Sequence, residues 1–162
     1  MSMDEDYAVS LPGRARPRRT RRTAALRELV AVTRVAPEQL IMPPFVLPAA
    51  RASEPIASMP GIDRMGIETL ADQAEKDLAL GIRSVLLFGV LEQGAKDPRG
   101  DAAHDADGPV PKAVRELKRR FGDDLIVITD VCLCEYTDHG HCGIVKRDEV
   151  VNDETLPQLA AM

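Results

Sequence analysis

Three short apolar runs alternate with two segments of helical periodicity, and this alternation is the strongest constraint on the fold. The runs cover 40–47, 84–90 and 125–131, and the last two are apolar at consecutive positions. Such runs are typical of strands buried on both faces of a parallel sheet. Segments 67–80 and 109–121 repeat apolar residues at helical spacing and are followed by glycine. The order predicts an α/β fold with a covered parallel sheet.

The chain before the first run is expected to be an arm and a short helix. Residues 1–22 show no apolar periodicity and predict an extended arm, whereas Thr23 is placed to cap a helix over 24–34. The prolines and glycines of residues 48–66 predict a long loop. Three strands do not complete a parallel α/β domain, since a (β/α)8 barrel takes about 250 residues. We therefore expect the sequence to be cut off before a fourth strand.

Charge is distributed unevenly along the chain. Residues 1–34 hold eight Arg and four acidic residues, whereas the remainder holds 13 Lys or Arg and 22 Asp or Glu. A basic arm beside an acidic body favours docking of the arm on a second copy of the chain. Nucleic acid is the competing partner, and we disfavour it because the acidic body would repel phosphate. No apolar run approaches the roughly 20 residues that cross a bilayer, and no secretory signal is present, so we expect no membrane partner and a cytoplasmic location.

The three cysteines of the chain, Cys132, Cys134 and Cys142, all follow the third apolar run closely. An odd count at such short spacing is a poor disulfide framework and a good local metal cluster in a reducing compartment. Because side chains alternate along a strand, Asp130 is expected to share a face with the first two cysteines at the strand's carboxyl end. In parallel α/β folds this end is where sites are built.

Two glycines around Cys142, at positions 140 and 143, permit a return of the chain onto the first two thiols. Three thiolates leave a fourth position open for water or substrate, as in catalytic zinc sites, whereas a structural site would recruit His139 or His141. The alternative is that the cysteines are merely buried, as cysteines often are. We favour a metal because histidines, glycines and an aspartate gather around the thiols.

Residues 130–143 resemble the metal-binding signature of the porphobilinogen synthase (delta-aminolevulinic acid dehydratase) family, in its cysteine-bearing, zinc-dependent form. The Arg-rich stretch 16–21 is similar to the family's arm, and 40–46 to its first barrel strand. Segments 58–64 and 87–90 also match, and the order is that of the family from about residue 16 onward.

The resemblance implies the N-terminal portion, about three βα units, of a (β/α)8 TIM barrel preceded by an extended arm. Residues 1–34 would be the arm and first helix that mediate oligomerisation, usually to octamers, and 35–162 a partial barrel truncated before the later strands. The implied activity is that of a lyase, which joins two 5-aminolevulinate molecules into porphobilinogen with loss of two waters, on the route to heme. The implied zinc ligands are Cys132, Cys134 and Cys142. Asp130 would line the active site, and the two histidines would support the ligands.

The sequence departs from the family's full machinery. The family's Schiff-base lysines lie on later strands, and its allosteric magnesium is associated with a carboxylate that this chain lacks. The lysines present fall at positions expected to be polar, namely Lys76, Lys96, Lys112, Lys118 and Lys146. The chain alone is therefore expected to be inactive, and the second hypothesis is a noncatalytic zinc-binding module that associates with a full-length relative. Glu135 stands where the family often has Pro, so we expect a local difference in the backbone.

Overall fold

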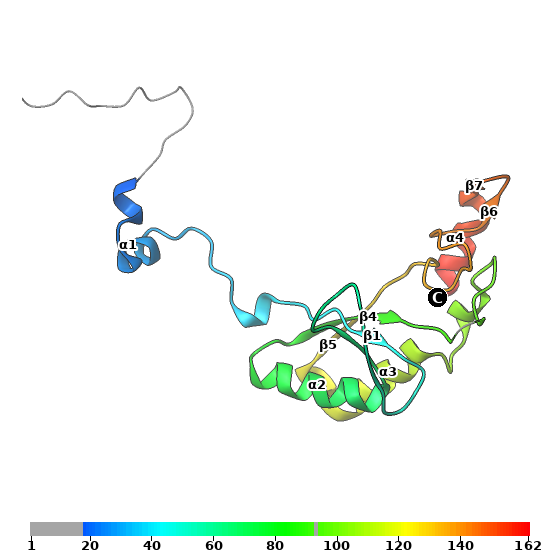
Figure 1. The fold of residues 1–162 in the computed structure, drawn as a ribbon, viewed down its shortest axis with the longest axis horizontal. Helices are drawn as coiled ribbons and strands as arrows, with labels where there is room; N and C mark the ends of the chain where they lie inside the picture. The colour runs from blue at the N-terminus through cyan, green and yellow to red at the C-terminus, as the bar shows by residue number, and fades with distance from the viewer. Residues whose placement is uncertain (1–17, 93) are drawn as a thin grey trace, which may run out of the picture. The chain divides into compact units, whose positions relative to one another are not determined.

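The computed structural model describes residues 18–92 and 94–162, which fall into two compact units with a boundary between Val35 and Ala36. Each unit is described by itself (Figure 1). The first contains a 3-10 turn over Arg18–Arg21 and helix α1 over Ala24–Leu29. Within the described ranges, no helix has the length and apolar character needed to span a lipid bilayer.

The first unit differs from its prediction in two ways. The expected extended arm lies outside the described residues up to position 17, and Arg18–Arg21 form a 3-10 turn instead of extended chain. Thr23 caps α1 as expected, since its Oγ1 accepts a hydrogen bond from the Leu26 N–H at 3.2 Å. The helix ends at Leu29, before the predicted position 34. Valines and a threonine follow, whose restricted side chains disfavour helix, and no packing compensates because the apolar residues here are exposed.

The second unit contains a five-stranded sheet in the order β2-β3-β1-β4-β5. Strands β3, β1, β4 and β5 pair in parallel with one another, and β2 pairs antiparallel with β3. The strands are β1 (Phe45–Val46), β2 (Ser53–Pro55), β3 (Asp63–Met65), β4 (Ser84–Gly89) and β5 (Ile126–Thr129). The main helices are α2 (Ile67–Ala79) and α3 (Pro109–Phe121). After β5 come the hairpin strands β6 (Val145–Lys146) and β7 (Glu149–Val150), and helix α4 (Asn152–Ala161).

Both main helices match their predictions and end for the predicted reason. Leu70 and Ala74 lie on the buried face of α2, and the chain leaves the helix through Gly81, whose φ of +91° suits a residue without Cβ. Helix α3 begins at Pro109, a position where a missing N–H costs nothing, and Gly122 follows it with φ +53°. The helical periodicity of the sequence was therefore sufficient to locate both helices.

The first apolar run forms a shorter strand than predicted. Only Phe45–Val46 are assigned to β1, because Pro43 and Pro44 carry no N–H for a ladder. The extended chain nevertheless pairs with β4 before the prolines, since the Met42 N–H donates to the Ser84 carbonyl at 2.9 Å. The run therefore occupies the predicted place beside β4, with its ladder interrupted at the prolines.

The segment predicted as a long loop, 48–66, contains two strands. Strand β3 pairs in parallel with β1, and β2 pairs with β3. The prediction of a loop was therefore wrong in part, because strands of three residues are too short to show a period of two. At the end of this segment the backbone packs tightly, since a Cβ on Gly66 would lie 2.7 Å from the Ala52 nitrogen.

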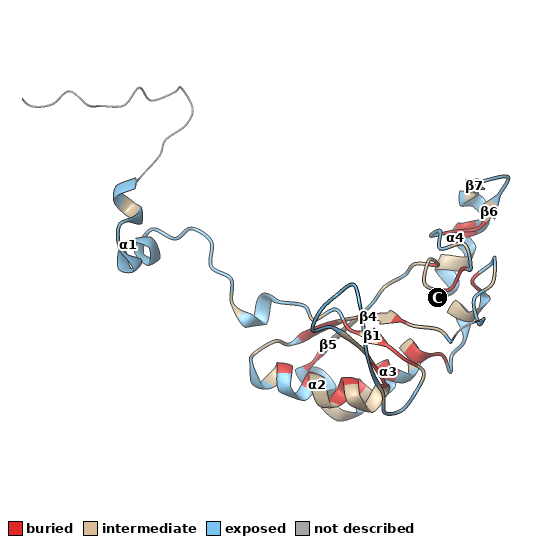
Figure 2. Ribbon diagram, viewed as in Figure 1, coloured by how far each residue is buried: buried red, intermediate tan, exposed pale blue. Residues whose placement is uncertain are grey.

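The core lies between one face of the sheet and the two main helices. Val46, Val85 and Leu87 point from the strands toward Leu70 of α2 and Leu117 of α3, and all are at most 1% exposed. Figure 1 shows α2 and α3 on the same side of the sheet, and in Figure 2 the buried residues concentrate at this contact.

The opposite face of the sheet is less covered than predicted. In β5, Ile126 is 56% exposed, and among the described residues no helix packs on this side. A sheet with helices on one side only is what the wall of a (β/α)8 barrel requires, because its inner face meets other strands of the barrel. The expectation of a sheet covered on both faces therefore fails at Ile126 of β5, whereas β4 is buried or half-buried at each of its positions.

Leu117→Ala tests the position of the core. The buried side chain leaves a cavity when truncated, so we expect a loss of about 2–5 kcal/mol in the free energy of unfolding. Leu80→Ala is the matched control, since Leu80 is 68% exposed, and its effect should stay within about 0.5 kcal/mol. Urea unfolding followed by circular dichroism measures both, and equal midpoints would contradict this placement of the core.

Candidate metal centre

The segment after β5, residues 130–144, carries all three cysteines and is called the cysteine loop below. Strand β5 ends at Thr129, and the loop then turns: the N–H groups of Tyr136 and Thr137 both donate to the Leu133 carbonyl at 2.9 Å. The predicted strand-like alternation of Asp130, Cys132 and Cys134 was therefore wrong. The turn that replaces the strand brings the thiols together.

The sulfur atoms of Cys132, Cys134 and Cys142 lie within 4.8 Å of one another. The first two are 3.3 Å apart, and all three cysteines are free thiols. Four-coordinate zinc binds thiolate at about 2.3 Å, which places sulfurs bound to one ion roughly 3.8 Å apart. The observed spacing therefore fits three donors to one metal ion after small side-chain adjustments. A fourth position is left for water or substrate.

The environment of these thiols favours their protonated form. Burial, together with the neighbouring Cys132 and Cys142 sulfurs, raises the pKa of the Cys134 thiol to about 12. The pKa of Cys142 is also raised, chiefly by its hydrogen bond with Cys132. A divalent ion reverses this preference because it binds thiolate and displaces the proton. The thiolate form of these three cysteines is therefore unfavourable without a metal and becomes favourable when a cation binds.

The return of Cys142 depends on the two glycines that flank it. Gly140 has φ +72°, a left-handed conformation that glycine adopts without strain. The hydroxyl of Thr137 then donates to the His141 carbonyl at 2.9 Å and closes the turn. At Gly143 a Cβ would lie 2.7 Å from the Thr155 hydroxyl oxygen, so the absence of a side chain lets the loop pass against α4. The predicted role of Gly140 in the return is confirmed by this geometry, whereas Gly143 instead leaves room for the side chain of Thr155.

The cysteine loop is attached to the loop between β4 and α3 through backbone pairing. The Asp97 N–H donates to the Tyr136 carbonyl at 3.3 Å, and the Asp138 N–H donates to the Asp97 carbonyl at 3.2 Å. The Asp97 carboxylate in turn accepts from the N–H groups of Arg99 and Asp101. The two loops therefore form one structure at the carboxyl ends of β4 and β5.

The two histidines contact backbone groups. The His139 Nε2 lies 3.3 Å from the Pro98 carbonyl, and its Nδ1 accepts the His141 N–H at 3.1 Å. These contacts suit the tautomer that carries its proton on Nε2. The three-sulfur cluster forms without either ring, and a supporting role for the histidines remains a prediction.

Asp130 and Glu135 bring negative charge to the site. Asp130 lines a hollow of about 340 Å³ together with Tyr136 and Val110. Glu135 Oε2 accepts the Gly89 N–H at 2.7 Å. Burial, together with the Asp130 charge, raises the pKa of Glu135 to about 7, against the lowering effect of that hydrogen bond. From the sequence, Glu135 stands out only as a departure from the family pattern. No sequence signal connects it with Gly89, which lies 46 positions earlier.

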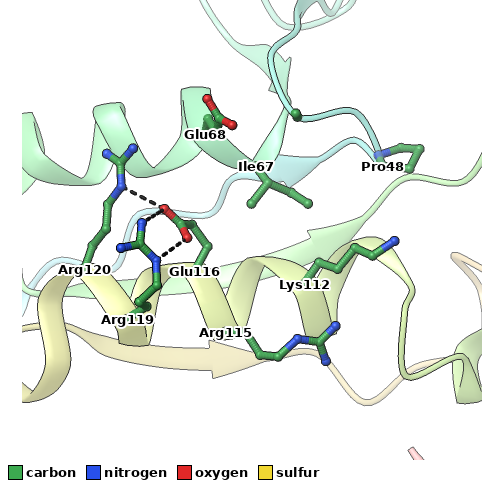
Figure 3. Close-up of a pocket in the computed structure, with 9 residues that line it drawn as sticks. Pro48, Ile67, Glu68, Lys112, Arg115, Glu116, Arg119 and Arg120 are labelled. Atoms are coloured by element: carbon green, nitrogen blue, oxygen red, sulfur yellow. Dashed lines mark hydrogen bonds and ion pairs between the residues drawn. The ribbon is translucent and has the colours of Figure 1, made fainter.

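A second cavity, of about 650 Å³, lies between α2 and α3, away from the cysteines (Figure 3). Its guanidinium groups are largely paired: Glu116 binds Arg119 at 2.7 Å and Arg120 at 2.9 Å. Arg120 also reaches Asp72 of α2 at 2.8 Å. This network joins the two helices, and we interpret it as a structural brace.

The lysines of the chain all lie in its described part, and all five are exposed. Lys118 Nζ donates to the carbonyls of Gly122 and Leu125, and Lys146 pairs with Glu154. None of them has the apolar surroundings that keep an amine neutral and nucleophilic. The prediction that these lysines occupy polar positions is confirmed.

Comparison with known proteins identifies extended similarity. The profile of the family described as "Delta-aminolevulinic acid dehydratase" matches residues 14–162. A delta-aminolevulinic acid dehydratase of Streptomyces coelicolor is 44% identical over 154 residues, which cover 94% of this chain and 46% of the relative. The enzyme of that name from Methanothermus sociabilis is 45% identical over 145 residues, 90% of this chain and 44% of the relative.

A solved structure shows the same fold. The crystal structure of delta-aminolevulinic acid dehydratase (porphobilinogen synthase) from Toxoplasma gondii, in complex with the product porphobilinogen, superimposes with a TM-score of 0.82 at 36% identity. The match covers 94% of this chain and 43% of that chain. The present chain thus spans less than half the length of these relatives, and its sheet corresponds to the N-terminal portion of their barrel.

Thr155→Val tests the attachment of the cysteine loop to α4. The Thr155 hydroxyl accepts the Ile144 N–H at 3.0 Å and donates to the Val151 carbonyl at 2.7 Å. Valine keeps the shape but leaves a buried N–H without a partner, which costs about 1–3 kcal/mol. We expect faster hydrogen exchange at the Ile144 amide, whereas Thr155→Ser, which keeps the hydroxyl, should retain protection. Unchanged exchange in the valine variant would contradict this contact.

Proposed function

Because the chain belongs to the delta-aminolevulinic acid dehydratase family, we propose that it provides the metal-binding part of a porphobilinogen synthase. This lyase condenses two molecules of 5-aminolevulinate into porphobilinogen with loss of two waters, in tetrapyrrole biosynthesis. The observation that carries the proposal is the cluster of three thiols within 4.8 Å at the carboxyl end of β5. Sites of (β/α)8 enzymes are built at this end of the strands.

We assign zinc as the metal, with Cys132, Cys134 and Cys142 as its ligands. Thiolate is a soft donor that favours zinc over magnesium or calcium, and three protein ligands are typical of catalytic zinc. When bound, zinc supplies Lewis acidity toward a substrate carbonyl or a water molecule. The cysteine loop contributes the donor set and the turn that aligns it.

Asp130 is proposed to line the substrate site beside this centre. Its carboxylate opens to the hollow that Tyr136 and Val110 also line. A carboxylate at this place favours the amino group of 5-aminolevulinate by charge, since unlike charges attract strongly where water is partly excluded. The residue would therefore orient the substrate relative to the thiol cluster.

The amine chemistry of the reaction is proposed to come from lysines outside this chain. A Schiff base requires an uncharged lysine in desolvated surroundings, and the five lysines present are all exposed. The same observation favours the second candidate function, a noncatalytic zinc-binding module that associates with a full-length relative. Self-association through the Arg-rich arm, a cytoplasmic location, and regulation of the full-length protein by magnesium are further parts of the proposal.

Replacing the cysteines tests the zinc assignment. Wild-type chain should bind one zinc per chain, and Cys132→Ser, Cys134→Ser and Cys142→Ser should each lower the affinity at least tenfold. The control is His139→Ala, which should retain stoichiometric zinc because the thiols form the cluster without the imidazole. Metal analysis and competition with a chromophoric chelator provide the measurement. Stoichiometric zinc in the serine variants would contradict the assignment.

Activity assays separate the metal-binding function from the complete reaction. The purified chain, given zinc and 5-aminolevulinate, should form no porphobilinogen, because each of its lysines is exposed and none has the desolvated surroundings that a Schiff-base lysine needs. Colorimetric detection of porphobilinogen with and without a chelator is the measurement, with a full-length relative as positive control. Zinc-dependent turnover by the chain alone would contradict the assignment of the lysine chemistry to residues outside it.

A further inference from the structure

Glu135, the residue directly after Cys134, ties the turn beside the first two thiols to the sheet through its side chain. We propose that Glu135 is a positioning residue for the metal centre, and that its carboxylate aligns the Cys132 and Cys134 sulfurs by binding the Gly89 N–H at the end of β4. This inference rests on the proposed metal-binding role of the thiols. It adds to that role a residue that neither binds the ion nor contacts the substrate.

The hydrogen bond joins two segments that are remote in the chain. Gly89 is the last residue of β4, and Glu135 directly follows Cys134. The distance between Glu135 Oε2 and the Gly89 nitrogen is 2.7 Å, which is short for a backbone donor and typical of a charge-assisted bond. Such a bond fixes the position of the residue beside Cys134 relative to the sheet.

The residues around Gly89 leave little space for a side chain at that position. A Cβ on Gly89 would lie 3.0 Å from the Tyr136 hydroxyl oxygen and 3.0 Å from a methyl group of Val110, so a larger residue would force the loop away. Tyr136 itself is 6% exposed, and the same Cβ would lie 3.5 Å from Glu135 Oε2. Partial exclusion of water strengthens the hydrogen bond and makes its loss more costly.

The other restraints on the loop lie beyond the thiol pair. The pairing of Asp97 with Tyr136 and Asp138 holds the chain after the turn, and Thr155 holds it at Ile144. Glu135 is the side chain next to Cys134 that bonds to the sheet. Without it, the 3.3 Å approach of Cys132 and Cys134 would depend on the turn's own backbone bonds.

Direct metal binding by Glu135 is the competing role, and the geometry disfavours it. Within the described residues, the group of donor atoms close enough to share an ion consists of the three sulfurs. The Glu135 Oε2 atom instead accepts a hydrogen bond from the Gly89 backbone N–H. The two roles differ in their response to glutamine, whose side-chain oxygen accepts a hydrogen bond but is a poor zinc ligand.

The test compares zinc affinity in the full 162-residue chain and three variants. Glu135→Ala should weaken zinc binding roughly 10–100-fold, the usual effect of removing a group that orients metal ligands. Glu135→Gln should stay within about threefold of wild type, because its amide oxygen still accepts the Gly89 N–H. The matched control is Asp138→Ala, which removes an exposed carboxylate from the same loop and should leave zinc affinity unchanged. Cobalt substitution adds a spectroscopic readout, since the glutamine variant should keep the tetrahedral thiolate bands and the alanine variant should lose intensity.

A second measurement does not depend on the metal. In metal-free protein, hydrogen exchange at the Gly89 amide should be fast in Glu135→Ala and protected in wild type and Glu135→Gln. Equal zinc affinity of wild type and Glu135→Ala, or equal protection of Gly89, overturns the inference. A glutamine variant that loses as much affinity as alanine also overturns it and indicates a metal ligand. Failure of the wild-type chain to bind zinc instead overturns the metal centre itself, while the exchange experiment still tests the Glu135 contact.

Discussion

The parallel pairing of β4 with β5 is the constraint on which the candidate site depends. The register runs from Ser84 opposite Ile126 to Leu87 opposite Thr129, so the two strands end at the same edge of the sheet. Two loops that are distant in sequence therefore leave the sheet side by side. Their backbones then pair at Asp97, and the cysteine loop gains a rigid neighbour. A loop that contained only the three cysteines would lack this support, and its conformational entropy would fall more when it bound an ion.

Local sequence signals were sufficient for the parts of the structure that depend on local physics. Helices α2 and α3 followed from apolar periodicity and terminal glycines, and the thiol cluster followed from close spacing. The hairpin β6–β7 illustrates the opposite case. Its turn places Arg147 and Asp148 at positive φ, positions that usually hold glycine or asparagine, so the sequence carried no turn signal. Strands β2 and β3 were missed because three residues are too few for a period.

In the cysteine loop the predicted sulfurs lie together, although the strand that was expected to align two of them is absent. Alternation along a strand predicted that Cys132 and Cys134 share a face, yet the strand stops at Thr129 and a turn centred on Leu133 brings the sulfurs together. The two sulfurs lie close together in either case, because a strand and this turn both place residues two positions apart on the same side. No local pattern in the sequence predicts the contact between Glu135 and Gly89. It depends on tertiary structure, and only the packed sheet reveals it.

The distribution of contacts separates two kinds of chemistry in this chain. Three side chains anchor the cysteine loop within the described residues. Glu135 bonds to β4, Thr155 of α4 bonds to Ile144, and Thr137 bonds within the loop. The amine chemistry has no comparable site, since all five lysines are exposed and Ile126 of β5 is 56% exposed. In a barrel, strand ends contribute catalytic groups separately, so one portion can carry a complete metal centre without the nucleophile. The physical requirements also differ, because thiolates need a cation nearby, whereas a reactive lysine needs an apolar site where its own charge is unfavourable.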